Sequence, residues 1–234
     1  MPEITSTYDI DRDWINRWRG ANRFTNSNWI KFMPLEDQEM VAKLKGLDEE
    51  EAKKVIIPYL EKKYQLNKEK MDEAVVKMTE YLNEQKAELF EAMEKLTRHP
   101  IDYALFTIYI TTLNRCPYGW QEGSIWMVDT KKPEYRKRNW TGIFAHELLH
   151  MQTHKYYENI KPMSKLTPKQ FNDLKESLTF LLNHEFEWID MREDIWYENH
   201  QQIRKALEEY RLNSDKNFDD LIAFGCDYMI KNNL

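Results

Sequence analysis

The chain has 234 residues, of which 41% are hydrophobic and 13% aromatic, and it carries a formal net charge of −6. This length suits one domain, or one domain with a helical extension; the composition excludes an intrinsically disordered chain, and the acidic balance excludes the basic footprint of a nucleic-acid-binding protein. No apolar run approaches the roughly 20 residues that cross a bilayer, and the N-terminus lacks the features of a signal peptide, so we expect a cytoplasmic protein with no membrane or nucleic acid partner.

The first hundred residues are expected to form a helical N-terminal region. Residues 1–33 are rich in aromatic side chains without clear periodicity, and we expect them to wrap onto the main body. Pro34 opens a helical segment that should end near Gly46. The acidic residues 48–51 suit the start of the next helix, which Pro58 should interrupt or kink.

The longest periodic segment runs from about Asn67 to Arg98. Its apolar residues recur at alternating steps of four and three, broken only at Gln85, which predicts one long amphipathic helix. Packing of this stripe against the chain's own core is the favoured interpretation, and a coiled-coil contact with a partner, in a scaffold role, is the alternative. The stripe consists of Met71, Val75, Met78, Leu82, Leu89, Met93 and Leu96.

The composition changes after Pro100, so we treat residues 1–100 and residues 101–234 as separate regions. Residues 105–113 (LFTIYITTL) and 123–130 (GSIWMVDT) are rich in β-branched and aromatic residues, which predicts two strands of a small sheet. The predicted fold class is therefore α+β and predominantly helical.

Helices are predicted for most of the remaining chain. One should run from a cap at Asn139 or Thr141 to about Glu158, and Thr167, which proline follows, should cap another. The last part of the chain should be helical, with a break around residues 213–217.

The two cysteines, Cys116 and Cys226, are far apart in the sequence and form no CxxC pair. Free thiols in a reducing compartment are therefore a simpler interpretation than a disulfide. Nothing in the sequence indicates an oligomeric state.

Three of the six histidines lie within residues 146–154, HELLHMQTH. His146, Glu147 and His150 form an H-E-x-x-H motif. On a helix the two histidines lie one turn apart on the same face, where they can bind one Zn²⁺. Glu147 is turned from His146 by about 100°, from where it can act as general base toward a water at the metal without being a ligand. The alternative is a helix whose histidines have only structural roles.

Zinc needs a third protein ligand. His154 is excluded because it lies about 12 Å along the helix from His146, whereas Zn–N bonds measure about 2.0–2.1 Å. The candidates lie on a downstream helix. Glu176, on a face that also carries an aromatic residue, is favoured over Glu185 and His184, which stay open as alternatives.

HELLH followed after 25 residues by ESLT resembles the gluzincin branch of the zincin-like metalloproteases, over about residues 103–190. In that family a glutamate on a second helix completes the metal site begun by the HExxH helix. The resemblance implies that His146, His150 and Glu176 are the zinc ligands and that Glu147 is the general base.

The resemblance also implies a zincin-like fold for residues 101–234, in which a small sheet precedes the active-site helix and its edge strand pairs with an extended peptide or protein substrate. Residues 123–130 are in the right place for that strand. Phe180 stands where some members of the family have an aspartate that holds a ligand histidine. The candidates for an oxyanion-stabilising residue are Tyr157, His184, Arg192 and His200.

The predicted function is that of a zinc-dependent metallopeptidase, which hydrolyses peptide bonds through a metal-activated water. The alternative is a non-catalytic zincin-like zinc-binding domain that acts as an interaction module. A di-iron carboxylate protein would need the Glu147-x-x-His150 element twice, and the sequence holds no second copy.

Overall fold

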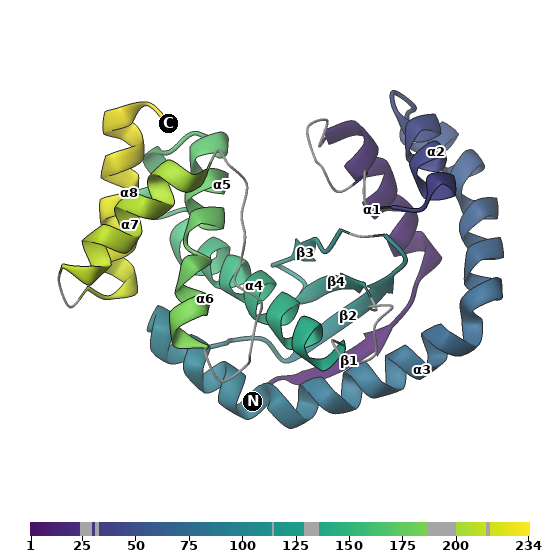
Figure 1. The fold of residues 1–234 in the computed structure, drawn as a ribbon, viewed down its shortest axis with the longest axis horizontal. Coiled ribbons are helices and arrows are strands. Elements are labelled where there is room, and N and C mark those ends of the chain that lie inside the picture. The colour runs from purple at the N-terminus through teal and green to yellow at the C-terminus, as the bar shows by residue number, and fades with distance from the viewer. Residues whose placement is uncertain (24–29, 31–32, 114, 129–135, 187–199, 214–215) are drawn as a thin grey trace. The chain divides into compact units, whose positions relative to one another are not determined.

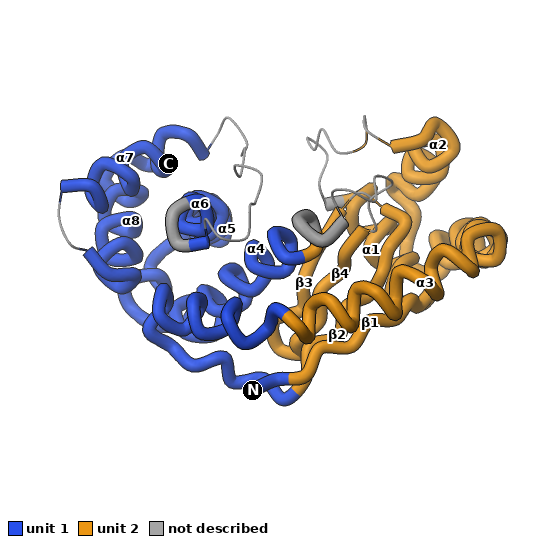
Figure 2. Tube along the Cα trace, turned by 60° about the horizontal axis from the view of Figure 1, so that its bottom comes forward, with its two compact units in different colours: residues 1–2, 85–104, 141–234 blue, residues 3–84, 105–140 orange. Residues whose placement is uncertain are grey.

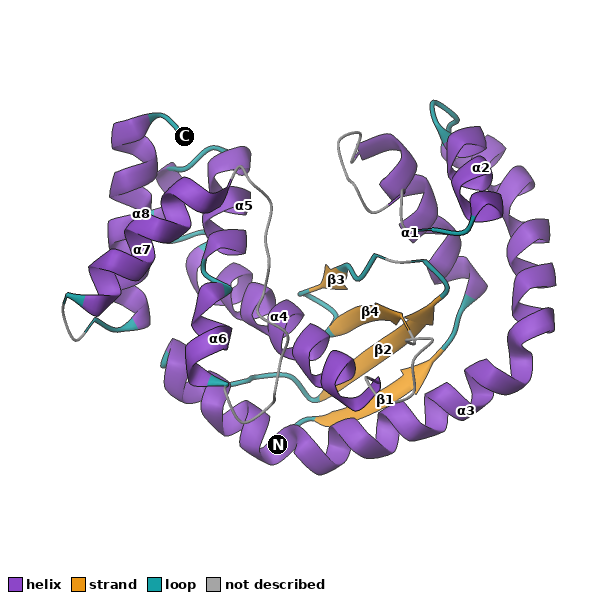
Figure 3. Cartoon of the chain, viewed as in Figure 1, coloured by secondary structure: helices purple, strands orange, loops and turns teal. Residues whose placement is uncertain are grey.

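The computed structural model describes residues 1–23, 30, 33–113, 115–128, 136–186, 200–213 and 216–234. The chain is mostly helical and carries a small mixed sheet (Figures 1 and 3), so the prediction of a predominantly helical α+β protein is confirmed. Within this described part, no helix is both long enough and apolar enough to cross a membrane.

The strands are β1 (Glu3–Thr7), β2 (Leu105–Thr111), β3 (Tyr118–Gly119) and β4 (Ser124–Val128). The helices are α1 (Ile10–Arg23), α2 (Leu35–Leu44), α3 (Glu49–Thr97), α4 (Arg136–Tyr157), α5 (Pro168–Ser177), α6 (Phe180–Glu185), α7 (Gln201–Leu212) and α8 (Phe218–Asn232), with a short 3₁₀ helix at Met163–Lys165.

The chain falls into two compact units (Figure 2). Residues 3–84 and 105–140 form the sheet unit, and residues 1–2, 85–104 and 141–234 form the helical unit. Helices α3 and α4 contribute residues to both units. The division of the chain at residue 100 stays a prediction, although β1 from the first region pairs with β2 from the second.

The sheet has the strand order β1-β2-β4-β3. β1, β2 and β4 are parallel, and the short β3 runs antiparallel to β4, with Tyr118 opposite Ile125. The two predicted strands are confirmed as β2 and β4, while β1 shows that the N-terminal segment joins the sheet. The expectation that residues 123–130 supply a free edge strand is wrong, because the chain after Pro117 folds β3 back onto β4, and the N–H of Trp126 donates to the Pro117 carbonyl (2.8 Å).

Side chains of α3 cover the outer edge of β1. The N–H of Ser6 donates to the Thr79 hydroxyl (2.9 Å), and Asn83 accepts from the N–H of Ile4 (3.3 Å) and donates to the Ile4 carbonyl (2.6 Å). An uncovered strand edge invites pairing with other chains, and these bonds satisfy the backbone groups that would take part. The helix therefore completes the sheet on this side.

Helix α3 is a single element of 49 residues, and Pro58 does not interrupt it as the sequence suggested. Proline lacks an N–H, which leaves the carbonyl four residues earlier, at Lys54, without its helical donor. Both residues are exposed, so water can satisfy that carbonyl. Ala52, Ile56 and Leu60 are buried and hold this part of the helix against the core.

The predicted apolar stripe of α3 faces the protein interior. Val75 and Leu96 are half-buried, and the other members are fully buried. This arrangement agrees with the interpretation that the stripe packs on the chain's own core. The buried members are Met71, Met78, Leu82, Leu89 and Met93.

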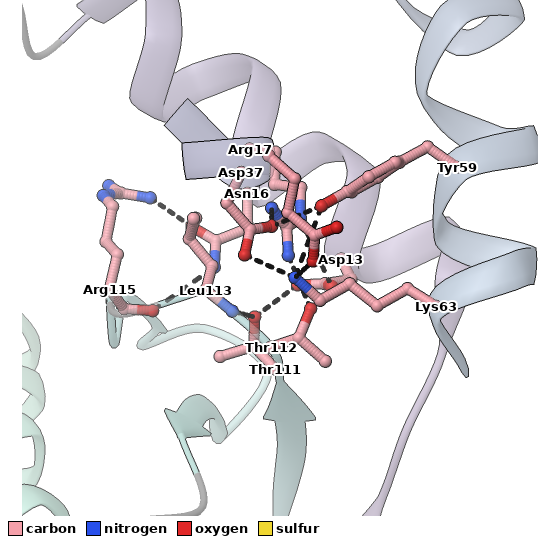
Figure 4. Close-up of polar contacts among 11 residues, drawn as sticks. Asp13, Asn16, Arg17, Asp37, Tyr59, Lys63, Thr111, Thr112, Leu113 and Arg115 are labelled. Carbon is pink, nitrogen blue, oxygen red and sulfur yellow. Dashed lines mark hydrogen bonds and ion pairs between the residues drawn. The ribbon is translucent and has the colours of Figure 1, made fainter. Parts of the chain in front are cut away.

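A buried network of ion pairs and hydrogen bonds joins α1, α2, α3 and the end of β2 in the sheet unit (Figure 4). The Arg17 guanidinium lies 2.8 Å from Asp37 Oδ1 and 3.7 Å from Asp13 Oδ2, and all three side chains are buried. Asp37 also accepts hydrogen bonds from Lys63 and from Tyr59 (2.8 Å). Burial by itself raises the pKa of Asp37, but the cations of Lys63 and Arg17 outweigh it and hold that pKa below its usual value.

Substitution Arg17→Met should lower the free energy of unfolding by about 3–5 kcal/mol, because it leaves Asp13 buried without its cation. Urea denaturation of wild type and variant measures the change. Arg12→Met is the matched control: Arg12 also lies on α1, but its ion pair with Glu122 (3.4 Å) is exposed, so the expected change is below about 1 kcal/mol. Equal effects of the two substitutions would contradict a structural role for the network.

Candidate metal centre

The H-E-x-x-H motif lies on α4, within the helical unit. The helix begins before the predicted caps at Asn139 or Thr141 and ends at Tyr157, close to the predicted end. The rings of His146 and His150 are 4.5 Å apart between centroids, with an interplanar angle of 79°. The motif is therefore helical, as predicted, and both imidazoles lie on one face.

Glu176, on α5, completes the cluster. Its Oε2 lies 3.3 Å from His150 Nε2 and 3.8 Å from His146 Nε2, and one donor atom from each of the three residues lies within 4.8 Å of the others. Two donors of a tetrahedral zinc site with bonds of about 2.0–2.1 Å are about 3.3 Å apart, so the distances of 3.3 Å and 3.8 Å from Glu176 Oε2 to the two imidazoles are near the separation that a shared cation requires. The structure thus brings together the three residues that the sequence predicted as ligands.

Access to the cluster differs between its two histidines. The side chain of His146 is 26% exposed, whereas that of His150 is 2% exposed. Glu147, the predicted general base, is buried. His146 is therefore partly accessible to solvent, whereas His150 is not.

Contacts at both ends of α5 fix the position of Glu176. A capping box between Thr167 and Gln170 starts the helix, which confirms the predicted cap. Helix α8 approaches α5 at Gly225, where a Cβ atom would lie 2.5 Å from Cδ1 of the buried Leu174. A larger residue at position 225 would therefore displace the Leu174 side chain from its packed position.

The chain turns directly after Glu176. Helix α5 ends at Ser177 and α6 begins at Phe180, so the single downstream helix predicted from the sequence is divided in two. The Thr179 hydroxyl donates to the Glu176 carbonyl (2.8 Å), which also accepts from the backbone N–H of Thr179 (3.4 Å). Phe180, the aromatic residue on the predicted face of Glu176, is buried.

Lys175 is a member of the site that sequence reasoning missed. Its Nζ lies 2.8 Å from Glu176 Oε1, and only 4% of its side chain is exposed. A signal was present, because Lys175 lies four residues after Phe171 and three before Leu178, within the apolar stripe of the predicted helix. A cation in an apolar stripe indicates a buried partner.

The charges in the cluster suit a bound cation. Burial, helped by the Lys175 ammonium and opposed by Glu176, lowers the pKa of His150 to about 3. Burial by itself raises the pKa of Glu176, but His150 and Lys175 outweigh it and hold that pKa well below its usual range. At neutral pH His150 is a neutral imidazole and Glu176 an ionised carboxylate, which are the protonation states that bind a metal, so the donor set fits zinc.

The alternative third ligands, Glu185 and His184, belong to α6 by their backbone, but their side chains lie outside the described residues. His154 is not a member of the cluster. Its Nδ1 lies 2.9 Å from Glu158 Oε2, and its ring lies 4.8 Å from that of Phe171. The distance along the helix between His146 and His154 predicts that His154 is not a ligand of the same ion.

Tyr157, an oxyanion candidate, lies about three helical turns beyond the first histidine of the motif. Its hydroxyl donates to Asp219 (2.6 Å) and lies 3.0 Å from Nε2 of His99. These contacts join α4 to the start of α8 and to the segment after α3. They give Tyr157 a structural role away from the cluster.

His200, a second oxyanion candidate, is buried, and its Nε2 lies 3.2 Å from Asp173 Oδ1. Asp173 lies one turn before Glu176 on α5. The side chain of His184 and the whole of Arg192 lie outside the described residues. An oxyanion-stabilising residue therefore stays a prediction without an assigned position.

Comparisons of this chain with models of known protein families, with curated proteins and with solved structures find no match. The resemblance of HELLH and ESLT to gluzincins therefore stays a prediction. The geometry of the cluster is the observation from which a function can be inferred.

The depressed pKa of His150 should make the metal-free protein less stable in acid. The unfolded chain protonates this imidazole near pH 6.5, whereas the folded chain does so only near pH 3, so this contribution to stability is complete above about pH 6.5 and is lost as the pH falls toward 3. Urea denaturation in the presence of a chelator, between pH 7 and pH 4, measures the loss, which is at most about 1.4 kcal/mol per pH unit for each proton. His150→Gln should reduce the slope, and an unchanged slope would contradict the assignment.

Proposed function

We propose that this protein is a zinc-dependent metallopeptidase of the zincin-like type, which hydrolyses peptide bonds in a peptide or protein substrate. The observation that carries the proposal is the convergence of His146, His150 and Glu176, whose donor atoms lie within 4.8 Å of one another. Two imidazoles and one carboxylate are a ligand set of catalytic zinc sites that keep a fourth position open. The choice of peptides as substrates follows from the resemblance of HELLH and ESLT to gluzincins.

Each residue of the cluster has a role in this proposal. His146 and His150 would bind the cation through Nε2, and Glu176 would bind it through Oε2. When bound, zinc supplies Lewis acidity, which lowers the pKa of a water to about 7 and polarises a carbonyl group. Glu147 accepts the proton of the attacking water and passes it to the leaving amine. Because Glu147 is buried, exchange of that proton with bulk water is limited.

The order of the elements is consistent with a zincin-like arrangement. Strands β2, β3 and β4 precede α4, which carries the H-E-x-x-H motif, and α5 with the third ligand follows. Cys116 and Cys226 form no disulfide with each other, which is usual in a reducing compartment, and on that basis we propose a cytoplasmic location.

The purified protein should contain about one zinc ion per chain by elemental analysis. Glu176→Ala should abolish zinc binding, because two imidazoles alone leave the metal without its third protein ligand. Glu185→Ala is the matched variant and should keep the metal. Loss of zinc from Glu185→Ala, with zinc retained by Glu176→Ala, would transfer the ligand role to Glu185. A wild-type protein that takes up no zinc even when zinc is supplied would refute the proposed function.

Glu147→Gln should reduce hydrolysis of a fluorogenic peptide library by about 10²–10⁴-fold while zinc content stays unchanged, because glutamine keeps the shape of the side chain but cannot accept the proton. Glu158→Gln, directly after the end of α4 and paired with His154 outside the cluster, is the control and should keep activity.

The same assay distinguishes the alternative of a non-catalytic zinc-binding domain. In that case the wild-type protein holds zinc and hydrolyses no member of the library, and Glu147→Gln leaves every measured property unchanged.

A further inference from the structure

The two carboxylate oxygens of Glu176 have different partners. Oε2 lies 3.3 Å from His150 Nε2, and Oε1 lies 2.8 Å from Lys175 Nζ. The histidines and the lysine therefore contact different oxygens of one carboxylate. Oε2, the oxygen near the two histidines, is therefore not the oxygen that Lys175 contacts.

Adjacency in the sequence does not explain the contact between Lys175 and Glu176. Consecutive side chains on a helix diverge by about 100°, so they do not normally face each other. Lys169, on the same helix, shows the ordinary arrangement: it pairs with Asp173 one turn away (2.6 Å), and its side chain is 72% exposed. Lys175 is only 4% exposed, and a buried ammonium is costly unless it is paired. Its burial against Glu176 is therefore a specific feature of the site.

We propose that Lys175 is a positioning residue that holds Oε1 of Glu176, so that only Oε2 is available to the metal. The inference rests on the proposed zinc site and adds a determinant of its geometry. A ligand carboxylate that is itself hydrogen-bonded keeps its orientation, and replacement of such an outer partner typically weakens metal binding. Ligation through one oxygen also keeps the coordination number low, which leaves open the position that a catalytic site needs.

A positioning role and a purely electrostatic role predict opposite changes in zinc affinity. The Lys175 ammonium has the same sign of charge as the metal, so loss of its charge alone would strengthen zinc binding. Loss of its hydrogen bond frees Glu176 to rotate and to present both oxygens, which weakens binding to a site built for one. The sign of the change therefore separates the two roles.

The experiment compares Zn²⁺ and Co²⁺ binding by the wild-type protein and by Lys175→Met. Zinc affinity, measured by competition with a chromophoric chelator, should fall by about 10–100-fold. The visible absorption of bound Co²⁺ should weaken, because coordination by both carboxylate oxygens raises the coordination number. Lys175→Arg keeps the charge and the donors and should restore both properties. Lys169→Met removes a lysine–carboxylate pair from the same helix and should change neither.

Unchanged or stronger zinc binding by Lys175→Met, with an unchanged Co²⁺ spectrum, overturns the positioning role and leaves the zinc site intact. If circular dichroism shows that Lys175→Met does not fold, Lys175→Leu, which also removes both the charge and the donor, takes its place, with the same expected and contradicting outcomes. A wild-type protein that binds neither metal refutes the proposed function and this inference together, which distinguishes that failure from the first.

Discussion

The approach of the Glu176 carboxylate on α5 to two imidazoles on α4 is the contact on which the candidate site depends. Removal of an anion and a titratable base from water costs free energy that only compensating charges or hydrogen bonds offset. Lys175 supplies one compensating charge, and His150 avoids the cost by staying neutral. A divalent cation between the three donors would supply the rest of the compensating interaction, since it takes the place of water around all three donors.

The two histidines and Glu176 are positioned by different kinds of interaction, local for the histidines and tertiary for Glu176. The sequence could therefore predict the first more directly than the second. The positions of His146 and His150 follow from four-residue spacing on a helix, which needs no knowledge of tertiary structure. The position of Glu176 depends on how α5 packs, and only its covered face and its resemblance to a known pattern indicated it. Lys175 escaped notice because neighbouring residues on a helix are not expected to interact.

The same distinction applies to the fold. Long periodic helices and apolar strands were predictable, because their patterns extend over many residues. Strand β1 carries a single buried apolar residue, Ile4, and β3 has only two residues, so neither has a pattern to recognise. Their pairing depends on partners elsewhere in the chain, such as Asn83 on α3. The continuity of α3 through Pro58 likewise depends on which side of the helix faces the core, a property that the proline itself does not reveal.

Gly225 shows that the site is sensitive to mutation at positions that supply no donor atom. It touches no candidate ligand, yet a methyl group there would displace Leu174, which lies two residues before Glu176 on α5. Such a variant would retain every histidine and carboxylate while altering the packing that positions Glu176. In a genetic screen for loss of metal binding, alleles with a complete set of donors would therefore map to this crossing of α5 and α8.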